Sequence, residues 1–335
     1  MTSFKGTKLE LVCPAGSVPM LRAAIEGGAD SVYCGLQDET NARNFPGLNL
    51  EAAELPGAVR WTHDKGGKLL LAINTFAKAG NTEAWQRAVD CAARARVDAI
   101  IAGDVGVLAY AHATWPDLRL HLSVQAAAGT AQAVEFYAQT YGVKRVVLPR
   151  VLSVEEITRL TKSVDVEIEA FVYGGLCVMA EGRCALSSYA TPGSPNLTGV
   201  CSPPESVSFI ESGDATTSRL GDFAIDRHAR NEPAGYPTLC KGRFVLDGEP
   251  SYLFEDPVSL NAMDMLASLS RAGVTAVKVE GRQRGKAYVS RVARAFRLAI
   301  AALEVGKPTA PYADLLTDLA EGRRETTGAY KKSWR

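Results

Sequence analysis

The sequence predicts an α/β protein, a (β/α)8 TIM-like barrel with a long cysteine-bearing insertion at the C-terminal mouth. Short runs of aliphatic and β-branched residues alternate with longer amphipathic stretches, a pattern typical of strand–helix units around a parallel sheet. About eight such units fit within the 335 residues, which favours a closed barrel over an open sheet. The rhythm breaks at residue 174 and returns only after residue 257, so we expect an insertion there.

The units can be placed one after another along the chain. The predicted strands cover residues 9–13, 31–35, 69–74, 99–103, 120–125, 145–149, 167–173 and 276–280. The predicted helices cover residues 18–27, 84–96, 106–113, 131–141, 154–163 and 288–306. The strand LLLAIN is almost continuously apolar, as expected when both strand faces are buried. We expect residues 1–335 to form one domain. An open doubly wound sheet is the rival, but no glycine fingerprint for a dinucleotide is present.

The predicted insertion, residues 174–257, is rich in Gly, Pro, Ser and Asp, and we expect it to be irregular. Because it leaves the end of a strand, it should lie at the barrel mouth, where barrel enzymes build their active sites. A structureless loop of this length is unusual in a compact domain. Something must therefore hold the insertion in place.

Charge and composition limit the functions to consider. The chain has 37 Lys and Arg against 37 Asp and Glu, which gives no indication of general nucleic-acid binding. No apolar run approaches the roughly 20 residues that a membrane span needs. The first residues, MTSFKGTKLELVCPAG, lack the pattern of a secretory signal. We expect a cytoplasmic protein with no nucleic-acid partner and no membrane span.

Cysteines suggest what holds the insertion. Four of the seven cysteines fall within it: Cys177, Cys184, Cys201 and Cys240. Disulfides are rare in reducing compartments, so clustered cysteines there more often bind metal. Four thiolates suit a 4Fe-4S cluster or a structural zinc. The wide spacing favours the cluster, although sulfur ligands alone do not choose between the metals. Unrelated buried cysteines are the remaining alternative.

Polar side chains at predicted strand ends are candidates for the rest of the site. In a barrel they converge at the mouth, where they could hold a charged or hydroxylated small molecule. Arginines there could pair with a carboxylate. The alternative is that strand ends are polar because they meet solvent. The catalytic candidates are Glu280, Arg282 and Arg150, and the substrate-binding candidates are Asn41, Arg43, Asn74 and Gln125.

Long segments of the chain resemble a known family. The segments LELVCPAG, GADSVYCGL, GGLCVMAEGRCALSSYATPGSPN and KVEGRQR are similar to the collagenase-like peptidase family, peptidase family U32. Within that family, QDETNARNFPGLN, AINTFAKAG, RVVLPRVLS and AGYPTLCKGRF resemble the branch that acts in oxygen-independent ubiquinone biosynthesis. The resemblance covers essentially the whole chain.

The resemblance implies a 4Fe-4S cluster on the four cysteines of the insertion. It also implies a heterodimer with a second family member, UbiV, that hydroxylates the ring of a quinone precursor without oxygen gas. A sterol-carrier-like lipid-binding protein, UbiT, is the implied further partner. Related tRNA-hydroxylating members imply prephenate as oxygen donor, and Arg43, Arg150 or Arg282 could clamp its two carboxylates.

Two other hypotheses stay open. The family name suggests a collagenase-like peptidase, but the sequence shows no matched nucleophile and histidine. In addition, Tyr173 stands where many peptidase-named relatives carry a histidine. The other hypothesis is a non-catalytic partner subunit in which the cluster only holds the insertion together.

Overall fold

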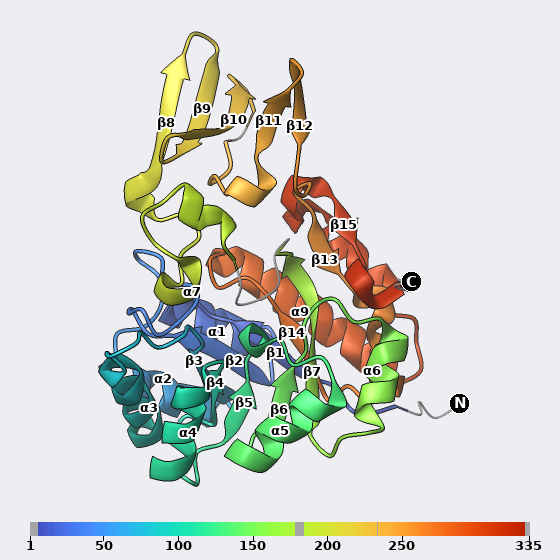
Figure 1. The fold of residues 1–335 in the computed structure, drawn as a ribbon. Helices are drawn as coiled ribbons and strands as arrows, with labels where there is room; N and C mark the ends of the chain where they lie inside the picture. Colours follow the sequence, from blue (N-terminus) through green and yellow to red (C-terminus); the bar gives the residue numbers. More distant parts are fainter. Residues whose placement is uncertain (1–5, 178–183, 233, 332–335) are drawn as a thin grey trace.

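Eight parallel strands form a closed barrel, as the sequence predicts. The computed structural model describes residues 6–177, 184–232 and 234–331. Neighbouring barrel strands follow the order of the chain, and the last strand pairs with both the seventh and the first (Figure 1). The strands are β1 (Glu10–Pro14), β2 (Ser31–Gly35), β3 (Lys68–Ile73), β4 (Ala99–Ala102), β5 (Leu120–Leu122), β6 (Arg145–Val147), β7 (Glu167–Gly175) and β14 (Ala276–Val279).

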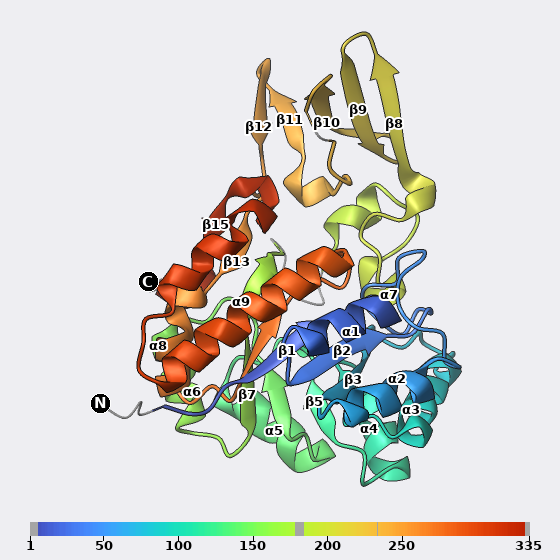
Figure 2. The same cartoon turned by 180° about the vertical axis from the view of Figure 1, so that it is seen from behind.

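Helices cover the outside of the barrel, and α1 and α9 lie side by side on it (Figure 2). The predicted helices are present: α1 (Val18–Glu26), α3 (Glu83–Ala95), α4 (Val105–Thr114), α5 (Ala131–Tyr141), α6 (Val154–Thr161) and α9 (Lys286–Glu304). The sequence pattern misses α2 (Leu55–Asp64) and α8 (Leu266–Arg271). The first has Pro and Gly in its opening turn, and the second is a single short segment. None of the helices described is long and apolar enough to cross a membrane.

The barrel interior has two layers of different chemistry. An apolar layer consists of Val12, Tyr33, Leu70, Ala99, Ile101 and Ala276. A layer of ion pairs lies toward the amino-terminal ends of the strands, where Arg145 contacts Glu10, Glu167 and the fully buried Glu169. Within this layer each buried charge therefore has an opposite charge beside it, which is what burial of ions requires.

The insertion is more regular than the sequence predicts. It contains a three-stranded antiparallel sheet and a separate hairpin. These strands are β8 (Val207–Ser212), β9 (Ala215–Leu220), β10 (Phe223–Ala229), β11 (Arg243–Leu246) and β12 (Glu249–Tyr252). The expectation of an irregular segment is wrong here because β8 and β12 are largely exposed and β9 is mostly polar, so the segment lacks a clear apolar alternation. Leu220, Ile225 and Leu239 form a small core of their own.

The C-terminal part of the chain returns to the barrel mouth. Strand β13 (Ser259–Asn261) pairs antiparallel with the upper end of β7, and β15 (Glu325–Thr326) pairs with β13. Between α9 and β15 lies the 3₁₀ helix η6 (Ala310–Leu319), which packs along α9. These elements bring residues near the C-terminus beside the end of β7.

Candidate functional site

A cavity of about 620 Å³ lies between the barrel mouth and the insertion. Its floor consists of residues at the ends of barrel strands, and its walls include the insertion and the C-terminal segment. Of the predicted site residues, all but Asn41 line this cavity. The structure therefore brings the predicted strand-end residues and the four cysteines into one place. The lining members of that set are Arg43, Asn74, Gln125, Arg150, Cys177, Cys184, Cys201, Cys240, Glu280 and Arg282.

Two asparagines shape the loop between β2 and α2 that carries Arg43. The buried Oδ1 of Asn41 accepts hydrogen bonds from the backbone N–H of Arg43 (2.9 Å) and from Arg282 (3.1 Å). Asn74, just after β3, accepts a hydrogen bond from the backbone N–H of Ala42 (2.9 Å). Both of these predicted substrate-binding residues thus position the loop, and Asn41 does so from outside the cavity.

Arg43 and Glu280 form an ion pair at the centre of the floor. The Nε of Arg43 is 3.7 Å from a carboxylate oxygen of Glu280, and its guanidinium donates a hydrogen bond to the carbonyl of Ala42 (2.7 Å). Burial alone would lower the pKa of Arg43, but Glu280, Cys201 and Cys177 raise it above its ordinary value. Arg43 is therefore a permanent cation that faces both the carboxylate and the thiols.

Two further cations lie against the ring of Tyr33 at the floor of the cavity. The Nζ of Lys278 is 3.9 Å from the ring centroid and donates a hydrogen bond to Glu169 (2.7 Å). The guanidinium of Arg282 is 5.5 Å from the same ring. Burial, with a smaller contribution from Arg43, lowers the pKa of Arg282 to about 10. Lys278 is not among the residues predicted from the sequence, although it stands two residues before Glu280 and alternate residues of a strand share one face.

Arg150 and Gln125 contribute to the wall next to β6 and β7. Arg150 donates a hydrogen bond to the carbonyl of Gly175 (2.7 Å), and its guanidinium lies 4.8 Å from the centroid of the Phe171 ring. It therefore holds the end of β7, from which the chain runs on to Cys177. Gln125 lines the cavity from the short 3₁₀ helix η1 (Val124–Ala126) that follows β5.

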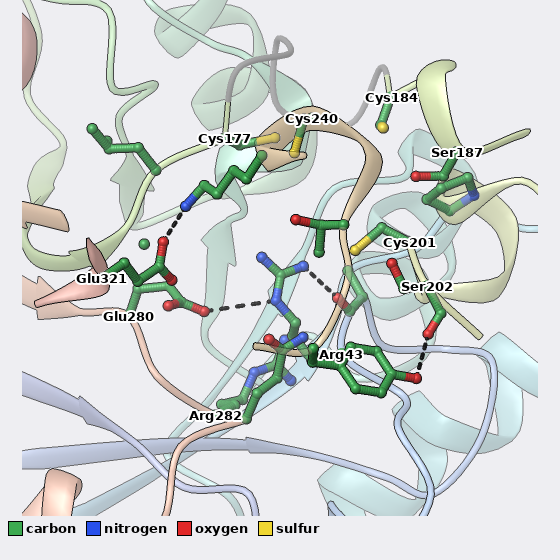
Figure 3. Close-up of a pocket in the computed structure, with 18 of the residues that line it drawn as sticks. Arg43, Cys177, Cys184, Ser187, Cys201, Ser202, Cys240, Glu280, Arg282 and Glu321 are labelled. Atoms are coloured by element: carbon green, nitrogen blue, oxygen red, sulfur yellow. Dashed lines mark hydrogen bonds and ion pairs between the residues drawn. The ribbon is translucent and has the colours of Figure 1, made fainter. Parts of the chain in front are cut away.

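An ion pair that the sequence analysis missed joins the insertion to the C-terminal segment. Lys241, in the 3₁₀ helix η4 (Leu239–Lys241), pairs with Glu321. A β-carbon on Gly175 would lie 3.0 Å from an oxygen of Glu321 and 3.6 Å from an oxygen of Glu280. The two carboxylates therefore flank the end of β7 (Figure 3). No local pattern marks Glu321, because Lys241, the ion-pair partner of its side chain, is distant in the chain.

The four thiols lie on the insertion side of this cavity (Figure 3). Burial raises the pKa of Cys240 to about 11, and the neighbouring Cys201 and Cys177 add to this effect. Burial likewise raises the pKa of Cys201, opposed by the positive charge of Arg43 and reinforced by Cys184 and Cys177. At neutral pH the raised pKa values favour the protonated thiols of Cys201 and Cys240, and a bound metal would favour their thiolates.

The four cysteines that line this cavity match the number of thiolates that a 4Fe-4S cluster takes. Each iron of such a cluster takes one thiolate, so the sulfurs surround a volume and do not meet at a point. Among the residues that the structure describes, no three His, Cys, Asp or Glu side chains are arranged to hold a metal ion. Residues 178–183, between Cys177 and Cys184, lie outside the described residues.

The cavity lacks the arrangement of a serine or cysteine protease in its described part. The histidine on its wall is His228 of β10, and neither of its buried ring nitrogens has a hydrogen-bond partner. Its Nε2 is 3.9 Å from the nearest oxygen of Asp226. The arginines and Lys278 on the floor, by contrast, suit an anionic organic ligand.

Comparison with known proteins identifies the family of the chain. The family model described as peptidase family U32 matches residues 16–332. The chain is 31% identical over 300 residues to an uncharacterized protease of Methanocaldococcus jannaschii, covering 87% of this chain and 65% of that protein. It is 31% identical over 328 residues to the tRNA hydroxylation protein P of Escherichia coli, covering 90% and 70%.

A third relative is a collagenase of Porphyromonas gingivalis, 31% identical over 304 residues, with 88% of this chain and 66% of that protein covered. The chain thus spans about two thirds of the length of these relatives. A solved U32 peptidase aligns with a TM-score of 0.48 at 14% identity, covering 85% of this chain and 98% of that structure. The match to the family model extends over almost all of the sequence, and the chain belongs to peptidase family U32.

Proposed function

We propose that the protein is the iron–sulfur subunit of an oxygen-independent hydroxylase that acts on the ring of a ubiquinone precursor. The 4Fe-4S cluster would be held by Cys177, Cys184, Cys201 and Cys240 and would supply electron transfer or substrate orientation when bound. The observation that carries the proposal is that one cavity combines four thiols with a cationic floor.

The chain's own residues would bind and orient an anionic reactant on that floor. Arg43 and Arg282 present positive charge from fixed positions, because Asn41 holds both. A dicarboxylate such as prephenate, proposed as the oxygen donor, would match these charges. Glu280, beside Arg43, would accept or return a proton at the reacting ring.

The proposed partners follow from the ubiquinone-biosynthesis branch of the family. UbiV would complete a heterodimer, and a UbiT-like lipid-binding protein would present the hydrophobic quinone precursor. The subunit would work in the cytoplasm. With these proposed partners, the protein would be a family member of the UbiU type.

Hydroxylation of RNA is a second candidate function, favoured by the name of the Escherichia coli relative. The balanced charge of the chain argues against general affinity for a polyanion. Peptidase activity is disfavoured because His228, on the cavity wall, has no hydrogen bond to a nucleophile among the described residues.

The cluster is tested by anaerobic purification of the full chain and measurement of iron and acid-labile sulfide. We expect about four of each per chain, with an absorbance shoulder near 400 nm. Cys240→Ser should lose most of the iron and sulfide, whereas Cys91→Ser, on the outer helix α3, should keep both. Zinc without sulfide in the wild-type chain would overturn the proposal.

The substrate is tested in cells that lack the gene and grow without oxygen. We expect loss of ubiquinone, its recovery with the wild-type or Cys91→Ser chain, and no recovery with Cys240→Ser. The hydroxylated tRNA nucleosides should remain unchanged in the same cells. Lost tRNA hydroxylation with normal ubiquinone would favour the RNA function instead.

A further inference from the structure

Arg43 connects the thiols with the carboxylate side of the cavity. Figure 3 shows it between Glu280 on one side and Cys201 on the other, with Cys177 and Cys240 above it. Its Nε is 3.7 Å from an oxygen of Glu280, and one terminal nitrogen is used by the carbonyl of Ala42 (2.7 Å). About a third of the side chain (33%) is exposed. The guanidinium has five N–H donors and can therefore donate further hydrogen bonds to a group in the cavity.

The backbone around Arg43 is held from several directions. Its N–H donates to Asn41 (2.9 Å), and its carbonyl accepts a hydrogen bond from Asn49 (2.7 Å). Asn49 is in turn tied to the end of β1 through the backbone of Gly16 (2.7 Å). The positive charge thus occupies a place that the protein sets before any ligand binds, which is the condition for an electrostatic role.

A fixed charge beside an iron–sulfur cluster has a predictable effect. Reduction adds one electron to a centre that is already negative because it carries four thiolates. A nearby cation or a hydrogen bond to sulfur stabilises the reduced form, and a nearby anion destabilises it. Arg43 and Glu280 are adjacent and opposite in charge, so they should act in opposite directions.

We propose that Arg43 and Glu280 form a pair that sets the reduction potential of the cluster held by the four cysteines. Arg43 raises the potential, and Glu280 lowers it by neutralising part of the arginine's charge. This inference rests on the proposed function, since it requires the cluster. It assigns Arg43 a positioning role toward the cofactor in addition to the ligand-binding role expected from the sequence.

The test is a potentiometric titration of the anaerobic full-length protein with dithionite, followed by electron paramagnetic resonance of the reduced cluster. We expect Arg43→Gln to shift the midpoint potential to a more negative value and Glu280→Gln to a more positive one. Arg87→Gln serves as the matched control, because Arg87 pairs with Glu83 on the outer face of α3. That variant should keep the wild-type potential. Iron and sulfide content are measured for every variant.

Opposite shifts distinguish the proposal from a merely structural role, which would lower the cluster content without moving the potential of the clusters that remain. The proposal is overturned if both variants titrate like Arg87→Gln or if both move in the same direction. If Arg43→Gln does not hold iron, the direction in which Glu280→Gln shifts the midpoint potential decides the proposal. A wild-type chain without iron and sulfide would instead reject the proposed function, and the pair's role with it.

Discussion

Charged side chains inside the barrel are paired so closely that each depends on its neighbours. Glu169 accepts hydrogen bonds from Lys278 (2.7 Å) and Arg145 (3.3 Å), while Arg145 also contacts Glu10 (2.8 Å) and Glu167 (2.7 Å). Removal of one partner from such a group leaves an uncompensated buried charge, which costs far more than a surface ion pair. The lower half of the barrel should therefore be sensitive to single charge changes.

We predict that Glu10→Gln lowers the free energy of unfolding by about 3 kcal/mol at pH 7. Burial would raise the pKa of Glu10, but Arg145 and Ser31 lower it from 4.5 to about 2. The stabilisation is therefore complete above about pH 5 and is lost as the pH falls toward 2. Urea unfolding at several pH values measures it, with the exposed Glu83→Gln as control. An equal loss at pH 3 and pH 7 would contradict this assignment.

Tyr173, near the end of β7, is buried and does not line the cavity. Its side chain is buried, donates a hydrogen bond to the carbonyl of Leu316 (3.1 Å), and packs against Tyr288 and Phe296. We predict that Tyr173→Phe costs about 1 kcal/mol of stability and leaves cluster content unchanged, because only one hydrogen bond is lost. Thermal unfolding and iron analysis check this. Loss of iron in Tyr173→Phe would instead place the hydroxyl in the site.

At the scale of elements, the segment that carries Cys201 packs directly on the loop that carries Arg43. Gly199 has a positive φ of 77°, and a β-carbon there would overlap the carbonyl oxygen of Asn41. Only glycine adopts this conformation without strain and lets the two backbones approach. The close packing of the cysteine segment on the loop thus depends on the absence of a β-carbon at residue 199.

We predict that Gly199→Ala destabilises the protein by about 2 kcal/mol and lowers its iron content, because Cys201 moves away from the other thiols. Gly193→Ala is the matched control in the same segment, since the nearest side-chain atom to its new β-carbon would be 3.6 Å away. Thermal unfolding and iron analysis of both variants measure the difference. Equal behaviour of the two variants would show that the contact with Asn41 is unimportant.

At the scale of the whole molecule, barrel and insertion differ in what stabilises them. The barrel has a large continuous core between strands and helices, whereas the core of the insertion sheet consists of Leu220, Ile225 and Leu239. So small a core provides little stability by itself. Under the proposed function, the cluster would supply much of the stability of the insertion.

We predict that removal of iron with a chelator leaves the barrel folded but opens the insertion to proteases. Trypsin should cleave residues 184–257 about ten times faster, while far-UV circular dichroism changes little. Exposed sites such as Arg230 are available there. Mass spectrometry of the fragments locates the cuts, and Cys91→Ser provides a control that keeps its iron. If removal of iron unfolded the barrel cooperatively, the prediction that only the insertion depends on the cluster would be wrong.

Part of the site could be foreseen because strand ends in a barrel share one edge. Arg150 and Glu280 are predicted at the mouth on that basis, and the four cysteines because their insertion leaves a strand end; all six line the cavity. Asn41 could not be placed correctly, since its burial depends on how the loop folds back on Arg282. Glu321 could not be found at all, because its partner Lys241 is distant in the chain.

Local patterning was sufficient to predict the barrel, its order of strands and the place of the insertion. Apolar periodicity and strand length are properties of neighbouring residues, and eight repeated units have few other ways to bury their faces. The small sheets of the insertion, the ion pair of Arg43 with Glu280 and the shared cavity depended on the folded chain. They arise from contacts between residues far apart in sequence, which no local pattern records.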